Sequence, residues 1–110
     1  MRDKFVVVFS TAPNQKAALR IAKSAVKDRL AACCNIVPGL RSIYVWKERL
    51  CDEKEVLCVF KTRKAMCKKL ENRIKELHPY EVPEIIAVDI DSGFKGYLEW
   101  IHAATRAGRG

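Results

Sequence analysis

One histidine in this sequence is well placed for chemistry, because it stands where a basic helical pattern gives way to an apolar one. His78 is followed directly by Pro79. An imidazole nitrogen is a common ligand of copper and zinc. A histidine at a helix end also often has a structural role, since its ring interacts well with the last carbonyl groups of the helix. Both interpretations of His78, as a metal ligand and as a structural residue, stay open.

A second candidate is a polar group at the end of an apolar segment. Lys61, Thr62 and Arg63 follow one another directly after the run 56–60. Two cations and a hydroxyl at one strand end are suited to binding an anion. The alternative is a strand end that simply reaches solvent, and no glycine-rich phosphate-binding loop accompanies the group.

The cysteines indicate free thiols. Their number is odd and no two are spaced as CxxC, which argues against a disulfide framework and against a thiolate zinc site. Free cysteine usually packs as a small apolar residue. A role in metal binding or redox chemistry is the alternative for the five residues, which are Cys33, Cys34, Cys51, Cys58 and Cys67.

Length and composition indicate one domain of ordinary size. The chain has 110 residues, and we expect one domain over 1–106 and a frayed tail over 107–110. The net charge is +8, but lysine and arginine alternate with glutamate, which is typical of a solvated surface. No apolar run approaches the roughly 20 residues of a membrane span, and no secretory signal is visible. We therefore expect a cytoplasmic protein that binds neither membranes nor nucleic acid.

The apolar periodicity predicts four strands and three helices to position these residues. Strands are expected over 5–9, 32–46, 55–61 and 84–90, with an irregularity at Pro38–Gly39 and a hairpin within 47–54. Helices are expected over 15–31, 63–77 and 94–105, the first capped by Asn14 and the second ended by Pro79. The order βαββαβ plus a short C-terminal helix predicts an α+β ferredoxin-like sandwich.

The expected strands are apolar on both faces, although two helices can cover only one face of the sheet. The runs 5–9 and 55–61 both show this pattern. A large exposed apolar face is a liability for a soluble monomer. The pattern therefore predicts an oligomer.

A series of short motifs in a fixed order resembles the CutA family of divalent-ion tolerance proteins over nearly the whole chain. The motifs are STAP (10–13), LAAC (30–33), NIVPG (35–39), SIY with Trp46 (42–46), EV (55–56), FKT (60–62), HPYEVPEI (78–85) and YL with Trp100 (97–100). The resemblance implies a ferredoxin-like homotrimer, with hairpins that pair between neighbours, similar in architecture to the PII signalling proteins. It also implies a non-enzymatic role in divalent metal-ion tolerance, copper included. No cofactor is obligatory, and Cu²⁺ or another divalent cation is a possible ligand.

The resemblance also indicates which residues to examine for metal binding. Copper binding in some family members is attributed to a cysteine at the end of the first strand and to two adjacent histidines before the Pro-Tyr pair. By position these residues are Ser10, Leu77 and His78 here. A hydroxyl is a poor ligand for soft copper and leucine cannot coordinate a metal. Cation binding would therefore use His78 with Cys33, Glu84 or residues of a neighbouring subunit.

A cleft between subunits is the other implied site. By resemblance, Lys61 and Glu84 lie near it and are expected to form a partly buried ion pair. We expect aromatic residues to form cleft walls or subunit contacts, with simple packing as the alternative. The expected cleft residues are Ser10, Lys61, Thr62, Arg63, Tyr80, Glu84 and Trp46, and the expected interface residues are Tyr44, Trp46 and Trp100. Glu48 stands where relatives commonly have glycine, so the hairpin turn is expected to differ locally.

Three other function classes are alternatives. A PII-like sensor of a small anionic metabolite or nucleotide would use the similar architecture and the group at 61–63. RNA binding would need stacking aromatic residues on the third strand, but 56–61 holds one aromatic residue and no glycine. An enzyme would need a catalytic constellation, and the motifs show neither a nucleophile–base set nor a redox CxxC.

Overall fold

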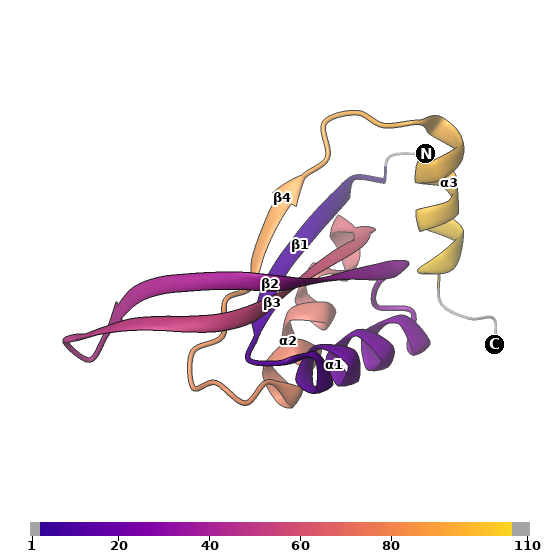
Figure 1. The fold of residues 1–110 in the computed structure, drawn as a ribbon. Coiled ribbons are helices and arrows are strands. Elements are labelled where there is room, and N and C mark those ends of the chain that lie inside the picture. Colours follow the sequence, from indigo (N-terminus) through magenta and orange to yellow (C-terminus); the bar gives the residue numbers. More distant parts are fainter. Residues whose placement is uncertain (1–2, 107–110) are drawn as a thin grey trace.

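The computed structural model describes residues 3–106, which form a sheet packed against helices (Figure 1). The predicted order of elements is confirmed. The tail expected over 107–110 lies outside the described residues. The elements are β1 Phe5–Ala12, α1 Gln15–Lys27, β2 Cys33–Trp46, β3 Arg49–Arg63, the 3-10 helix η1 Lys64–Met66, α2 Cys67–Leu77, β4 Ile86–Asp89 and α3 Lys95–Ala104.

The four strands form one antiparallel sheet in the order β2-β3-β1-β4. Helices α1 and α2 cover one face of it, and α3 stands at one end of the sheet (Figure 1). This arrangement is the predicted ferredoxin-like sandwich. The structure corrects four bounds by three residues or more. Strand β1 ends at Ala12 rather than at residue 9, and β3 starts at Arg49 rather than at residue 55. Helix α1 ends at Lys27 rather than at residue 31, and α2 starts at Cys67 rather than at residue 63, after the 3-10 helix η1.

Local sequence explains where the helices begin and end. The Asn14 side chain accepts a hydrogen bond of 2.8 Å from the backbone N–H of Ala17, which caps α1 as predicted. His78 is extended with ψ 136°, because the following Pro79 disfavours the helical region for the residue before it. These two residues fix the start of α1 and the end of α2.

The core lies between the sheet and helices α1 and α2. Alternate residues of each strand point toward the helices, so Val6 and Val8 of β1 and Phe60 of β3 are at most 2% exposed. They pack with Leu70 and Ile74 of α2. Burial of these side chains is the main stabilising term of the subunit.

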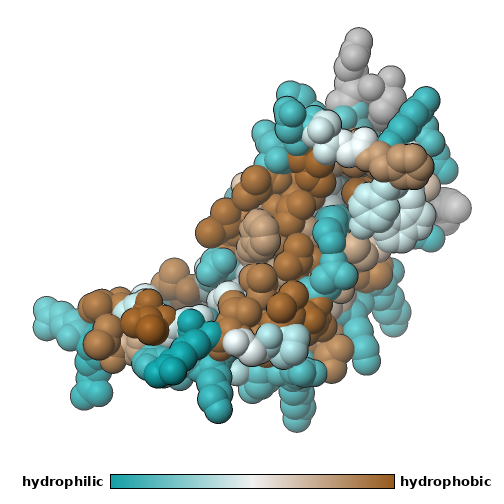
Figure 2. All heavy atoms as spheres, turned by 45° about the horizontal axis from the view of Figure 1, so that its top comes forward, coloured by the Kyte–Doolittle hydropathy of each residue, from teal (hydrophilic) through white to brown (hydrophobic). Residues whose placement is uncertain are grey.

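The opposite face of the sheet is apolar and only partly covered by its own chain. Val7, Phe9, Leu57 and Val59 are half-buried there, while Val37, Ile86 and Val88 are 42%, 51% and 49% exposed. Figure 2 shows a broad apolar area over the body of the molecule, continuing toward the projecting hairpin. The prediction that the strands are apolar on both faces is confirmed.

The long strands β2 and β3 continue beyond the sheet as a two-stranded hairpin arm (Figure 1). The register shifts between Val37 and Leu40, at the predicted irregularity, where Gly39 has φ 89°. The arm then pairs regularly up to Trp46 and Arg49. Its apolar residues Ile43, Val45 and Leu50 are 65%, 67% and 75% exposed, so the arm has few contacts with its own subunit.

The two-residue turn at the tip of the arm has positive φ at both positions. Lys47 has φ 51° and Glu48 has φ 68°. Such turns match the twist of a hairpin, but the left-handed region favours glycine and asparagine. The turn therefore keeps this geometry although no glycine stands at position 48.

Candidate ligand pocket

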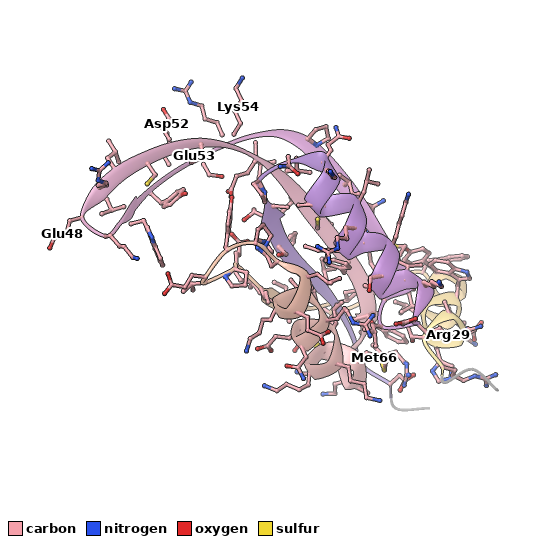
Figure 3. All side chains as sticks on the ribbon, turned by 90° about the horizontal axis from the view of Figure 1, so that it is seen from below. Arg29, Glu48, Asp52, Glu53, Lys54 and Met66 are labelled. Carbon is pink, nitrogen blue, oxygen red and sulfur yellow. The ribbon has the colours of Figure 1, made fainter. Side chains whose placement is uncertain are left out.

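A cavity of about 680 Å³ lies between the hairpin arm and the loop that joins α2 to β4. Figure 3 shows the arm arched over this loop, with Asp52 and Lys54 pointing away from it and Glu53 toward its concave side. Three segments supply the lining: the end of β1, the arm, and the loop 79–84. The lining residues are Thr11, Ser42, Ile43, Tyr44, Trp46, Glu55, Pro79, Tyr80, Glu81, Val82 and Glu84.

His78 holds the loop against the end of β1. Its Nε2 lies 2.6 Å from the backbone oxygen of Thr11, and its Nδ1 accepts a 3.1 Å hydrogen bond from the backbone N–H of Tyr80. Because Nδ1 is the acceptor, Nε2 carries the proton and donates it to Thr11. Both ring nitrogens are therefore occupied, and the residue is 8% exposed. This geometry supports the structural interpretation of His78 and leaves no lone pair for a metal ion.

Tyr80 and Glu55 join the loop to the arm. The Tyr80 hydroxyl donates a 2.6 Å hydrogen bond to Oε2 of Glu55. Glu55 is 6% exposed. Burial, and then the bond to Glu55, raise the pKa of Tyr80 well above its ordinary value, so the hydroxyl stays a donor. A buried carboxylate thus faces the cavity with one oxygen held by a neutral partner.

Two aromatic side chains of the arm form the opposite wall. Tyr44 and Trp46 are 39% and 41% exposed, and both line the cavity. Desolvation raises the pKa of Tyr44, with smaller contributions from Cys51 and nearby carboxylates. The ammonium nitrogen of Lys47 lies 5.8 Å from the centre of the Trp46 ring and 3.8 Å from Oε1 of Glu81.

The polar group at 61–63 lies away from this cavity. Arg63 pairs with Phe5 across the sheet, whereas the cavity residue Thr11 pairs with Leu57, six positions further along β1. At about 3.3 Å per residue Arg63 lies roughly 20 Å from the cavity end of β1, and Lys61, which pairs with Val7, lies roughly 13 Å from it. Lys61, Thr62 and Arg63 are therefore not part of the cavity.

Each residue of that group makes contacts that hold the subunit together. The Lys61 ammonium donates to the side-chain oxygen of Asn35, and within residues 3–106 it forms no ion pair with Glu84, so the expected pair is absent from a single chain. Buried Thr62 donates a 2.8 Å bond to the Leu30 carbonyl. The Arg63 guanidinium donates two 2.8 Å bonds to Thr105.

The residues proposed as metal ligands do not meet within one chain. Cys33 pairs with Lys61 at the far end of β2 and lies 3.7 Å from the Tyr97 hydroxyl. Ser10 is buried on the helix side of the sheet, and among residues 3–106 its hydroxyl has no hydrogen-bond partner. Over residues 3–106 no group of three or more His, Cys, Asp or Glu side chains is arranged to hold a metal ion. Within those residues, a single subunit thus offers no ready set of three such ligands to a divalent cation.

Sequence reasoning missed Glu55 as a cavity residue. The signal was present, because Glu55 is the acidic first residue of a predicted strand whose next five residues, 56–60, are all apolar. Glu81 and Thr11 were also missed, although both lie inside motifs that had been noticed. The predicted residues Tyr80, Glu84 and Trp46 do line the cavity.

The sequence matches the family model of the CutA1 divalent ion tolerance protein over residues 6–104. The chain belongs to the CutA1 family. The predicted resemblance is confirmed.

Individual CutA1 relatives agree in sequence and in fold. The chain is 48% identical to the divalent-cation tolerance protein CutA of Thermus thermophilus over 99 residues, covering 90% of this chain and 96% of the relative. It is 42% identical to the chloroplastic CutA protein of Arabidopsis thaliana over 92% of its own length, but it spans only 56% of that relative. The crystal structure of CutA1 from Oryza sativa matches with a TM-score of 0.91 at 41% identity, covering 96% of each chain.

Within the described part of this CutA1 chain, the helices are all too short or too polar to cross a membrane.

Proposed function

We propose that this CutA1 family member is a homotrimeric, non-enzymatic protein of divalent-ion tolerance, copper included, that binds a small ligand in the cavity beneath the hairpin arm. The observation that carries the proposal is the uncovered apolar face of the sheet together with the projecting arm. Both need a partner surface, since exposed apolar patches of this kind mark interaction sites.

A trimer of the same chain accounts for both features. Packing three sheets around a common axis would bury Val37, Ile86 and Val88, which are 42–51% exposed in the subunit. Arms that pair between neighbours would cover Ile43, Val45 and Leu50 and would satisfy backbone groups at the edge of the arm. The predicted interface residues Tyr44, Trp46 and Trp100 are 39–46% exposed and so are accessible to a neighbour.

Direct binding of copper would require ligands from more than one subunit. Glu84 is exposed and lines the cavity, so it is the residue of this chain that a shared site would use. His78 would first have to give up its bonds to Thr11 and Tyr80. We therefore favour a small ligand, rather than a metal ion held by one subunit, as the direct occupant of the cavity.

Native mass spectrometry of the purified protein with and without Cu²⁺ tests this proposal. We expect a trimer in both conditions and no copper bound within an isolated subunit. Replacing Val88, 49% exposed on the open face, by lysine is expected to yield monomers. A wild-type monomer at micromolar concentration would contradict the proposal.

A PII-like sensor of a small anion is the second candidate, and the cavity does not favour it. The charged residues that line it are Glu55, Glu81 and Glu84, which repel anions. A thermal-shift panel of nucleotides and carboxylates is expected to leave the melting temperature unchanged. We also propose a cytoplasmic location, which cell fractionation tests.

A further inference from the structure

The cavity beneath the arm holds a negative charge that its own subunit does not neutralise. Glu55 is 6% exposed, yet within residues 3–106 it forms no ion pair and its one hydrogen-bond donor is the Tyr80 hydroxyl. A hydroxyl donates a hydrogen bond but carries no positive charge. Burying a carboxylate without a counter-charge is unfavourable, so a cation bound beside Glu55 would stabilise this site.

The sign of the lining charges is opposite to that of the whole chain. The sequence has 21 lysine and arginine residues and 13 aspartate and glutamate residues. Nevertheless, each charged residue that lines the cavity is a glutamate, namely Glu55, Glu81 and Glu84. Glu53 points to the same concave side of the arm (Figure 3). An acidic cavity in a basic protein attracts cations and excludes anions.

The walls indicate which kind of cation fits. Tyr44, Trp46 and Tyr80 all line the cavity, and aromatic faces attract organic ammonium ions through the negative charge of their π-systems. A volume of about 680 Å³ is typical of a small-molecule site. A bare metal ion would leave most of it empty and, over residues 3–106, would find no set of three suitable side chains.

One ammonium group of the protein, that of Lys47, already lies beside an aromatic ring and a carboxylate of the arm and loop. The Lys47 ammonium lies 5.8 Å from the centre of the Trp46 ring and 3.8 Å from Glu81 Oε1. It occupies the outer edge of the site at the turn of the arm, where both partners are accessible. The inner part, next to Glu55, has the same combination of carboxylate and aromatic ring but no lysine or arginine among its lining residues.

From these observations we propose that the cavity binds a small organic ammonium ion, with its cationic group between Glu55 and the rings of Tyr44, Trp46 and Tyr80. This inference rests on the proposed function, because it names the ligand class of the same cavity. It differs from direct metal binding, since the cation is recognised by aromatic faces and by one buried carboxylate.

Calorimetric titration of the intact assembly tests the proposal. The probes are choline, ethanolamine, and the uncharged isostere of choline in which carbon replaces nitrogen. We expect saturable binding of at least one ammonium ion, with the isostere at least about tenfold weaker than choline if choline binds. Equal binding of choline and its isostere, or no saturable binding of either ammonium ion, would overturn the proposal. The second result includes the case in which a side chain of a neighbouring subunit fills the cavity.

Two variants and one matched control complete the test. Glu55→Gln removes the charge but keeps an oxygen for Tyr80, and we expect at least about a tenfold loss of affinity for the ammonium ion. Glu48→Gln removes the same charge from the tip of the arm, away from the cavity, and should not change the affinity (Figure 3). Trp46→Leu removes one aromatic wall at a residue that is 41% exposed, and we expect it to weaken binding about threefold or more. This variant serves if Glu55→Gln does not fold. Wild-type affinity in either folded variant would refute the assigned contacts.

The subunit count of the same samples, measured by native mass spectrometry, separates this inference from the proposed function. A trimer that binds no ammonium ion contradicts only the ligand class. A protein that is not a trimer contradicts the proposed assembly, whatever it binds.

Discussion

The hydroxyl of Tyr80 donates a 2.6 Å hydrogen bond to Oε2 of Glu55, and this bond connects the loop after α2 to the base of the hairpin arm. Glu55 is 6% exposed. The two residues are 25 positions apart in sequence and belong to different segments. The bond therefore fixes one side of the cavity and gives the buried carboxylate a donor.

Replacing Tyr80 by phenylalanine should destabilise the protein, because Glu55 would stay buried without that donor. We expect a loss of about 1–3 kcal/mol in the free energy of unfolding. Urea denaturation at fixed subunit concentration measures it. In a double-mutant cycle, Glu55→Ala, which removes the acceptor, should cost less in the Tyr80→Phe background than in the wild type. Strictly additive effects would mean that the hydrogen bond contributes little.

Stability should also fall at alkaline pH, and Tyr80 should contribute to the fall. Burial and Glu55 raise the pKa of its hydroxyl in the folded state. In the unfolded chain the phenol releases its proton at about pH 10, which is a lower pH than in the folded state. Above about pH 10 the folded state therefore binds more protons than the unfolded state. The stabilisation is therefore complete below about pH 10 and is lost as the pH rises further. Urea midpoints from pH 8 to 11 should fall less steeply for Tyr80→Phe than for the wild type.

His78 is expected to matter for stability rather than for metal binding. His78→Ala removes the donor to the Thr11 carbonyl and the acceptor for the Tyr80 N–H, which should cost about 1–3 kcal/mol of unfolding free energy. His78→Gln keeps an N–H donor and should recover part of the loss. Copper titrations of the folded variants should match the wild type. A clear loss of copper affinity in both variants would restore His78 as a ligand.

The turn of the arm offers a stabilising substitution. Glu48 has φ 68°, which glycine adopts without the steric cost that a side chain adds. Glu48→Gly should therefore raise the unfolding free energy by about 0.5–1 kcal/mol, with a higher melting temperature in calorimetry. Glu48→Gln provides the control and should leave the melting temperature unchanged. A lower melting temperature for Glu48→Gly would show that the turn has another conformation in solution.

The sequence predicted the elements because their signals are local. The apolar spacing of α1 and α2, the Asn14 cap and the helix end before Pro79 each depend on residues within a few positions of one another. The family was also predicted from local signals, namely the short motifs and their order along the chain. The apolar pattern of 5–9 and 55–61 also indicated that the sheet would have two apolar faces.

Which side chains meet was decided by the tertiary structure. Sequence reasoning placed Lys61 and Glu84 near a cleft between subunits, which stays a prediction. Within one chain the pairing of β1 with β3 places Lys61 beside Asn35 and away from the cavity. The register shift between Val37 and Leu40 and the length of β3 place the arm over the loop 79–84, where Glu55 meets Tyr80. The residue types and the periodicity of the elements were thus present in the sequence. The ligand pocket depends on strand register and on contacts between distant segments, which no local pattern encodes.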